Sequence, residues 1–399
     1  MTDAILGYLA GQQSAMVALL TDLAAMESPT DDPPSIAPVL DRLSKEFGLS
    51  GMLVRRIPGR QTAGLLVARP ATRTRRMPIQ LLVGHCDTVW PVGTRASMPV
   101  EVVDEQIRGP GVFDMKGGLV QMIFALRALG AVGCELPATP VAIVTSDEET
   151  GSPESKVTTV RLARRAIRAF VLEPAFGSSG KLKTSRKGVG EFEIIIRGRA
   201  AHAGLNPGEG ASAVLELSHQ IQRLFALNDP ARGVSVNVGT IDGGLRSNVV
   251  APEVRAKVDI RVPARADMER LEAAIRSLTP VNPETTIHVS GSFGHAPLEP
   301  APRNRQLWQL ARSLGRTIGI DLEEAAVGGA SDGNTISQYT ATLDGLGAVG
   351  DGAHALHEHV LASKLAERAA LVALLLAAPL AEDGRAARPR DDRIHEVPR

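Results

Sequence analysis

The sequence is poor in cysteine, in aromatic residues and in net charge. Its only cysteines among 399 residues are Cys86 and Cys134, and two thiols cannot build a disulfide framework. We therefore expect a reducing compartment, which for this chain means the cytoplasm. The formal net charge is zero, aromatic residues make up 3%, and no basic stripe is interleaved with aromatics. These features exclude nucleic acid as the expected partner.

Long apolar runs are also missing. No stretch approaches about 18 uninterrupted apolar residues, so a membrane span is not expected. The N-terminal segment has an acid at Asp3 and no basic region, which does not resemble a secretory signal. Its apolar positions instead fit an amphipathic helix, and they are Ile5, Leu9, Met16, Leu19 and Leu20.

The length and composition suit two globular domains. Hydrophobic residues make up 44% and charged residues 22%, as in ordinary globular proteins. In the first half, short apolar runs alternate with helical patterns. Strands are predicted at 79–85, 140–149 and 168–174, and helices at 117–129 and 157–166. This alternation predicts an α/β domain with a mostly parallel mixed sheet flanked by helices.

The pattern changes in the middle of the chain. Polar and apolar residues alternate over 190–198, and the segments that follow predict the order β-α-β-β-α-β. This is the order of a split βαβ, ferredoxin-like domain. We therefore predict one discontinuous domain at 1–181 and 294–380, interrupted by a smaller α+β domain at 182–293. The charged tail at 381–399 is predicted to be disordered.

Polar side chains gather where the predicted strands end, and in open α/β sheets ligands bind at that edge. His85 and Asp87 follow the first strand, and Asp114 precedes the helix that begins at 117. The other candidates are Asp147, Glu148, Glu149, Glu173, His354, His357 and His359. Histidines combined with several carboxylates are the ligands of a two-metal site with nitrogen and oxygen donors.

Each cluster also has a simpler interpretation. Asp114 could cap the following helix, SDEE could be a solvated turn, and HALHEH could be a surface helix. The glycine-rich GPGVFDMKGG lacks the spacing and the preceding strand of a nucleotide-binding loop. Burying several carboxylates together is costly unless cations neutralise them, which favours a metal site.

The two adjacent glutamates suit hydrolysis. On an extended segment neighbouring side chains diverge, so Glu149 could bind a metal while Glu148 faces a water. A carboxylate base accepts the proton of a metal-activated water and passes it on. The chemistry indicated is hydrolytic rather than redox.

Together these motifs resemble the co-catalytic zinc exopeptidases. The motifs are GHCDTVWP, GPGVFDMKGG, SDEETGS, LEP, HAG and GGASDGN. The resemblance covers nearly the whole chain and is closest to the glutamate carboxypeptidases, in a group with acetylornithine deacetylases, succinyl-diaminopimelate desuccinylases and aminoacylases. It implies two Zn²⁺ ions per subunit, with Co²⁺ or Mn²⁺ as substitutes. The implied ligands are His85 and Glu173 for one zinc, Glu149 and His354 for the other, and Asp114 between them.

The resemblance implies further roles near the metals. Glu148 would be the general base, and Asp87 would orient His85. A cis peptide bond is implied after Asp114. The family pattern H-[AS]-x-x-E-[HY]-[IV] fits HALHEHV only if His354 is the ligand.

The inserted domain resembles the lid and dimerisation domain of this family. RAAHAG places His202 where family members reach into the neighbouring subunit and stabilise the oxyanion. Asn248 and Arg261 resemble the groups that bind the terminal carboxylate of the substrate. Gly329, in VGGASDGN, resembles a backbone position that lines the substrate site. Without the resemblance, His202 would be a surface histidine and Arg261 an exposed strand charge.

We predict a zinc-dependent hydrolase that cleaves an amide bond next to a free carboxylate. It would release a C-terminal amino acid, with glutamate as one candidate, from a peptidyl or N-acyl small-molecule substrate, and it would form a homodimer through the lid. An alternative is an N-acyl-amino-acid deacylase of the acetylornithine deacetylase or aminoacylase type. A catalytically silent binding protein on this fold is more remote, because the base and all ligands are present. Cys86 is expected to point away from His85 and Asp87 into the core.

Overall fold

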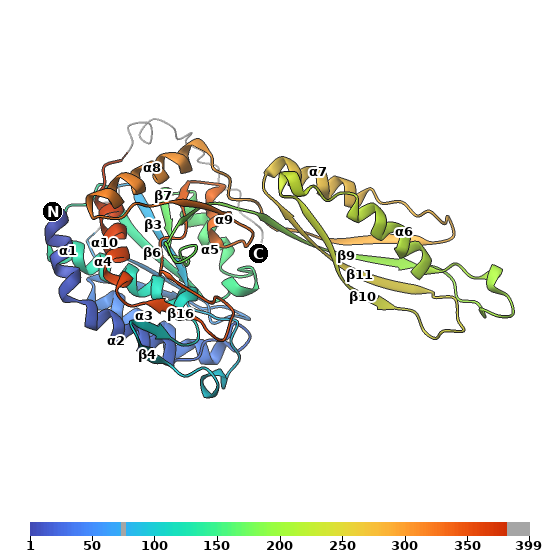
Figure 1. Ribbon diagram of the computed structural model, residues 1–399, viewed down its shortest axis with the longest axis horizontal. Helices are drawn as coiled ribbons and strands as arrows, with labels where there is room; N and C mark the ends of the chain where they lie inside the picture. The colour runs from blue at the N-terminus through green and yellow to red at the C-terminus, as the bar shows by residue number, and fades with distance from the viewer. Residues whose placement is uncertain (73–76, 381–399) are drawn as a thin grey trace, which may run out of the picture.

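The computed structural model describes residues 1–72 and 77–380, so the tail at 381–399 lies outside the described residues. Figure 1 shows a large rounded body and an elongated second body that projects from it. Two neighbouring chain segments join the bodies, and they are paired by a bridge between Arg186 and Leu298.

The large body is built on a six-stranded sheet with the order β1-β2-β6-β3-β7-β14. Strand β3 lies parallel to β6 and β7, β14 lies parallel to β7, and β2 runs antiparallel to β6. The prediction of a mostly parallel mixed sheet is therefore confirmed. The strands are β1 (Met52–Ile57), β2 (Leu65–Pro70), β3 (Ile79–His85), β6 (Thr139–Thr145), β7 (Ala166–Val171) and β14 (Ala341–Leu343).

Helices cover both faces of this sheet, which is why its central strands β3 and β6 are buried at every position and are mostly apolar. Leu82 of β3 packs into a large core with helices α1 to α4, α8 and α10, whereas Leu81 and Val83 face a second core with α5 and α9. Neighbouring residues of a strand point to opposite faces, so both cores receive apolar residues from β3, β6 and β7. The helices are α1 (Thr2–Gly11), α2 (Gln13–Ala25), α3 (Pro33–Leu49), α4 (Gly117–Ala131), α5 (Lys156–Ala163), α8 (Pro302–Thr317), α9 (Asp332–Ser337) and α10 (Lys364–Ala377).

The N-terminal segment differs from the expected amphipathic helix. It forms two helices, α1 and α2, which meet at 58°. The five apolar residues named above are nevertheless all buried in the core. Among the described residues no single helix is long and apolar enough to cross a membrane, although α1 and α2 taken together have sufficient length and apolar composition.

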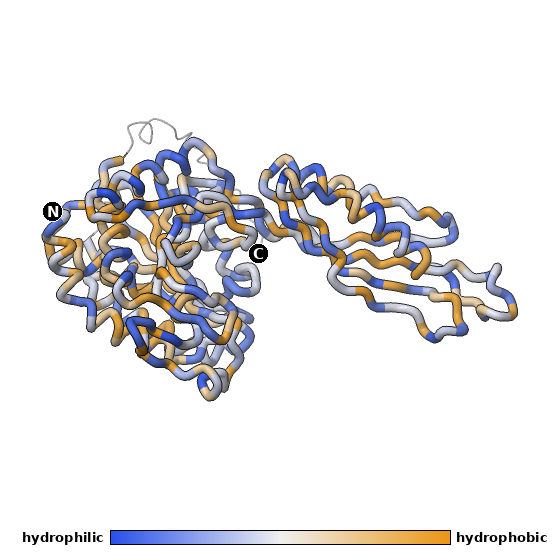
Figure 2. The backbone as a smooth tube through the Cα atoms, viewed as in Figure 1, coloured by the Kyte–Doolittle hydropathy of each residue, from blue (hydrophilic) through white to orange (hydrophobic). Residues whose placement is uncertain are grey.

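The elongated body has the predicted β-α-β-β-α-β order. Its sheet has the strand order β10-β11-β9-β12, and two helices lie along one face (Figure 1). Alternate strand residues such as Phe192 and Ile194 are buried against Leu217 and Leu271 of those helices, and the apolar stripes follow the strands in Figure 2. The elements are β9 (Gly188–Arg197), α6 (Ala213–Phe225), β10 (Ser235–Gly243), β11 (Glu253–Val262), α7 (Arg265–Arg276) and β12 (Thr286–His295).

The connection between the bodies differs slightly from the expected boundaries at 182 and 293. Strand β8 (Leu182–Arg186) pairs with β13 (Glu324–Val327) in the large body, and β12 continues to His295. The buried side chain of Asn334 donates hydrogen bonds to the carbonyls of both connecting segments, at Lys187 and Ala296. A further small sheet contains β4 (Glu101–Val103), β5 (Gln106–Arg108), β15 (Gly350–Asp351) and β16 (His359–Leu361).

Candidate metal centre

His85 and Asp87 lie at the carboxyl end of β3. His85 Nδ1 lies 3.4 Å from Asp87 Oδ1 and 3.1 Å from the Asp87 carbonyl. Asp87 Oδ2 accepts hydrogen bonds from the Thr30 hydroxyl at 2.8 Å and from the Glu149 N–H at 3.2 Å. Asp87 therefore fixes the ring of His85 and also the turn that carries Glu149.

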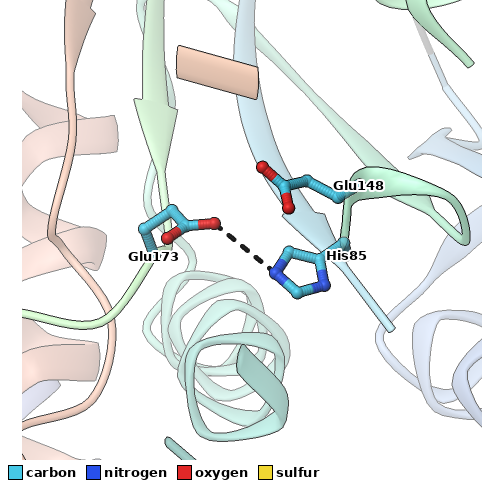
Figure 3. A group of neighbouring side chains, drawn as sticks. All are labelled: His85, Glu148 and Glu173. Carbon is cyan, nitrogen blue, oxygen red and sulfur yellow. Dashed lines mark ion pairs between the residues drawn. The ribbon is translucent and has the colours of Figure 1, made fainter. Parts of the chain in front are cut away.

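The other ring nitrogen of His85 faces two carboxylates. Nε2 lies 3.2 Å from Asp114 Oδ1 and 3.5 Å from Glu173 Oε1, and Figure 3 shows Glu173 opposite the ring. Burial opposes a charge on His85, but the carboxylates of Asp114, Asp87 and Glu173 outweigh it and raise its pKa well above the ordinary value. The ring thus lies in a strongly negative environment, which is an environment that also attracts a metal cation.

Asp114 lies between two histidines. Its Oδ1 faces His85, while its Oδ2 lies 3.6 Å from His354 Nε2, which is also 3.1 Å from Glu149 Oε2. The Asp114–Met115 peptide bond is cis, as the resemblance implied. Asp114 is not the cap of the following helix, because the cap residue of α4 is Lys116.

The glycines after Asp114 explain how this loop reaches the sheet. A Cβ atom on Gly118 would collide with the carbonyl oxygen of Leu172, so only glycine allows α4 to begin against the end of β7. Glu173 follows Leu172 directly. The close approach therefore places Asp114 and Glu173 in one cluster.

Glu148 and Glu149 follow β6 in a short 3₁₀ turn, Glu148–Thr150. The expectation of an extended segment here is wrong, because Asp147 turns the chain by accepting the N–H groups of Glu154 and Ser155. The two side chains still diverge. The potential ligand atoms of Glu148, His85 and Glu173 all lie within 4.8 Å of one another. The same holds for a second group, made of Glu149, His85 and Asp114. Figure 3 shows the Glu148 carboxylate above the His85 ring.

The donor set fits a pair of divalent cations. Burial, together with neighbouring carboxylates, raises the pKa of Glu148 well above its ordinary value and raises that of Glu149. Among the described residues, the buried Oε1 atom of Glu149 has no hydrogen-bond partner. Carboxylate oxygens and imidazole nitrogens that converge in this way are ligands suited to Zn²⁺ and related ions.

His354 is the histidine of HALHEH that joins the cluster. The segment forms a turn between β15 and β16 rather than a surface helix. The neighbouring Glu149 carboxylate raises the pKa of His354 to about 9, although partial burial opposes this. His359 instead pairs with the carbonyl of His357, at 3.0 Å.

Sequence reasoning missed two cations beside Glu173. Arg186 Nη2 donates to Glu173 Oε2 at 3.0 Å and Arg186 Nε donates to Asp344 Oδ2 at 2.7 Å, while Lys183 Nζ lies 4.0 Å from Glu173 Oε2. Burial favours the neutral acid, but Arg186 and His85 lower the pKa of Glu173 below its ordinary range. The signal was the basic run KLKTSRK at 181–187, separated from LEP by six residues, whose alternating pattern is typical of an exposed strand.

Asp332, in GGASDGN, was also missed as a contributor to the site. It is buried, and it accepts hydrogen bonds from the hydroxyls of Ser152 at 2.6 Å and Thr145 at 3.3 Å. Burial raises the pKa of Asp332 to about 6, and its charge adds to the raised pKa of Glu148. Gly329, in the same loop, presents its carbonyl to Arg186 Nη1 at 3.1 Å.

The predicted lid residues lie apart from this cluster within one chain. His202 and Asn248 are neighbours, since the Ala203 N–H donates to the Asn248 carbonyl. They lie in segments 198–212 and 244–252, beyond the strand ends at the far tip of the elongated body (Figure 1). Arg261 lies at the other end of β11, where its guanidinium pairs with Asp259 at 2.8 Å. Cys86 is fully buried in the large core, as expected.

Comparison with known proteins gives one consistent result. Residues 81–378 match Peptidase family M20/M25/M40. Carboxypeptidase G2 of Pseudomonas sp. (strain RS-16) is 26% identical over 375 residues, covering 92% of this chain and 89% of that protein. A succinyl-diaminopimelate desuccinylase of Xanthomonas oryzae pv. oryzae is 28% identical over 329 residues, covering 77% and 85%.

Solved structures share the fold. Aminopeptidase PepT of Bacillus cereus superposes with a TM-score of 0.77 at 23% identity, covering 92% of this chain and 98% of that one. The YXEP protein of Bacillus subtilis, a dinuclear metal binding peptidase, superposes with a TM-score of 0.67 at 12% identity, with the same coverage.

Proposed function

Because the chain belongs to peptidase family M20/M25/M40 and is a hydrolase of that family, we propose that it cleaves an amide bond next to a free carboxylate. The product would be a C-terminal amino acid, with glutamate as the first candidate. The observation that carries the proposal is the convergence of two histidines and four carboxylates at the carboxyl edge of the sheet.

The proposed ligands are two sets that share one carboxylate. They are His85 and Glu173 for one Zn²⁺, Glu149 and His354 for the other, and Asp114 for both. Co²⁺ or Mn²⁺ would substitute. Bound cations supply positive charge that polarises the substrate carbonyl and acidifies water.

Glu148 is the proposed general base. Its carboxylate faces the space between His85 and Glu173 (Figure 3), and burial moves its pKa upward, toward the range in which a carboxylate can both accept and return a proton at neutral pH. It takes a proton from the attacking water and delivers it to the nitrogen of the departing amine. Asp87 holds the ring of His85 in place during this transfer.

A second cation beside the cluster, Lys183, supports an acidic leaving group. The Lys183 side chain is largely buried, and its ammonium lies 4.0 Å from Glu173 Oε2, which is too far for a hydrogen bond. Within the described part of the chain its three donors thus remain available to a substrate anion. We assign the terminal carboxylate of the substrate to Arg261 and, because Asn248 lies at the opposite end of the lid within one chain, to Asn248 of the partner subunit in a dimer. The second carboxylate of a glutamate product is assigned to Lys183.

A second candidate is an N-acyl-amino-acid deacylase. The 28% identity to a desuccinylase over most of both chains favours it, and the hydrolytic groups would be the same. The two reactions differ in which half of the substrate is recognised. A hydrolysis screen of N-acyl-amino acids and dipeptides on zinc-loaded protein, with products quantified by mass, separates them. Fast release of glutamate from varied acyl partners supports the first function. Release of one acyl group from varied amino acids supports the second, and no hydrolysis of either class would refute both.

We further propose that the protein is a cytoplasmic homodimer joined through the lid. Both cysteines are free, which suits a reducing compartment. His202 lies at the far tip of the lid, and exposed apolar residues of the lid include Ile241 and Leu245. In a dimer His202 would enter the site of the partner subunit and stabilise the oxyanion.

Subunit mixing tests the dimer. Wild-type chains are combined with His202→Ala chains that also carry Glu148→Gln. If His202 acts across the interface, these mixtures contain an inactive heterodimer, because one site has the wild-type base but lacks the partner's histidine and the other has the histidine but lacks the base. Neither heterodimer site would then be complete, and activity would fall below the wild-type fraction. Activity proportional to the amount of wild-type chain would refute the role across the interface.

A further inference from the structure

Three chain segments that carry candidate metal ligands meet at one side chain, Glu358. The first segment follows His85 and contains Trp90, the second is the loop 109–116 with Asp114, and the third is the turn 352–358 with His354. None of these segments is a long helix or strand. Their mutual position therefore depends on specific side-chain contacts.

The Glu358 carboxylate makes four hydrogen bonds. Oε1 accepts the N–H groups of Phe113 at 2.9 Å and Asp114 at 3.1 Å. Oε2 accepts the N–H of Gly111 at 3.0 Å and the indole Nε1–H of Trp90 at 2.9 Å. The residue is 1% exposed. Hydrogen bonds to a buried, charged acceptor are short and strong, so this carboxylate joins all three segments firmly.

Glu358 also closes the turn that presents His354. The Glu358 N–H donates to the Ala355 carbonyl, and the Ala355 N–H donates to the Gly352 carbonyl. Within this turn His354 has φ of 60°, a left-handed conformation that is uncommon for a residue other than glycine. Such a conformation persists only where the surroundings hold it. Asp114 and His354 form an ion pair. The side chain of Glu358 thus holds the backbone of Asp114, while the backbone of Glu358 holds the turn that carries His354.

We propose that Glu358 is a positioning residue that sets the separation of Asp114 and His354 and thereby the metal affinity of the site. The inference rests on the proposed two-metal function. It predicts that the replacement Glu358→Gln disturbs metal binding. A glutamine has one acceptor oxygen and an NH₂ group, so two of the four donors would face another donor. Because these donors belong to the backbone of 111–114 and to Trp90, the loop with Asp114 would shift.

A matched control exists in the lid. Glu216 is also 1% exposed and accepts two backbone N–H groups, from Val281 at 2.9 Å and Asn282 at 2.8 Å. Glu216→Gln removes a buried acceptor of the same kind far from the metal ligands. Any effect of Glu358→Gln that Glu216→Gln shares is a general cost of disturbing a buried carboxylate.

The test measures zinc binding to the purified full chain. Zinc stoichiometry is obtained from elemental analysis and affinity from competition with a chelator, beside the thermal midpoint of the zinc-free protein. We expect Glu358→Gln to weaken the more labile zinc by about 10- to 100-fold, and kcat to recover partly at high zinc. Glu216→Gln should lower only the thermal midpoint. Wild-type zinc affinity and kcat in Glu358→Gln would overturn the proposal.

Zinc binding by the wild-type protein distinguishes failure of the proposed function from failure of the proposed role of Glu358. If wild-type chains bind no zinc, the proposed function fails; if they bind two and Glu358→Gln binds two equally well, only the role of Glu358 fails. Should Glu358→Gln not fold, Trp90→Phe removes one of the four donors and keeps the carboxylate. It should weaken zinc binding several-fold, and unchanged affinity in that variant would equally overturn the proposal.

Discussion

His354 Nε2 lies 3.1 Å from Glu149 Oε2 and 3.6 Å from Asp114 Oδ2, so one imidazole faces two carboxylates that come from distant parts of the sequence. The Glu149 carboxylate raises the pKa of His354 to about 9. A protonated ring cannot bind a metal, so an ion that enters must displace this proton. The contact therefore couples metal binding to pH at this position.

The first prediction concerns this histidine. His354→Ala should reduce the zinc content from two ions per chain to about one, because one of the two proposed ligand sets loses its imidazole. Elemental analysis of the dialysed protein measures this. His357→Ala is the matched control from the same turn and should retain both ions. A loss of zinc in His357→Ala, with none in His354→Ala, would reverse the assignment.

The second prediction separates the base from its neighbour. Glu148→Gln should keep both zinc ions and lower kcat by about 10²- to 10⁴-fold, the usual contribution of a general base. Glu149→Gln should lose zinc, since Glu149 Oε2 is the partner of His354. Zinc content and steady-state kinetics are measured on the same preparations. Near wild-type turnover in Glu148→Gln would rule out its role as base.

The sequence was sufficient to predict the central strands and the strand-end residues. The central strands are buried on both faces and are therefore mostly apolar runs, and the polar residues that follow these runs mark the carboxyl edge of the sheet. Edge strands were harder to find. Strand β1 contains the exposed residues Arg55 and Arg56, and β15 has only two residues, so neither produces a clear periodic signal.

The supporting residues of the site could not be predicted for a different reason. Arg186 and Lys183 alternate with small polar residues like an exposed strand, but β8 lies inside the large body against Glu173. Burial of a charged residue depends on partners far away in the sequence, and one sequence does not show those partners. Glu358 belongs to the motif HALHEHV, but its role follows only from the four hydrogen bonds that its carboxylate accepts.

The third prediction tests the acidic substrate. Lys183→Met should lower kcat/KM for a substrate that releases glutamate by about tenfold or more, because a hydrogen bond between charged groups is worth about 1.5–3 kcal/mol. A matching substrate that releases alanine should be affected far less. Lys181→Met is the control, since Lys181 pairs with Glu323 at the surface. Equal losses for both substrates in Lys183→Met would show that Lys183 does not select the leaving group.

The last prediction is a pH dependence outside the metal cluster. Hydrogen bonds from the Thr62 hydroxyl and from the N–H groups of Gln61 and Arg60 lower the pKa of Glu154 to about 2. An acid whose pKa is lower in the folded state stabilises the protein above its unfolded pKa, near 4.5. That stabilisation is lost as the pH falls from about 4.5 to about 2.

Hydrogen exchange of the Arg60 and Gln61 amides measures this stabilisation, because the carboxylate accepts both N–H groups. Glu154→Gln should speed their exchange, relative to wild type, at pH 6, and the difference should shrink toward pH 2, where the wild-type acid also becomes neutral. Glu101→Gln, at an exposed glutamate on β4, is the control and should leave these amides unchanged. Protection that is equal in wild type and Glu154→Gln at pH 6 would show that the carboxylate does not hold this loop.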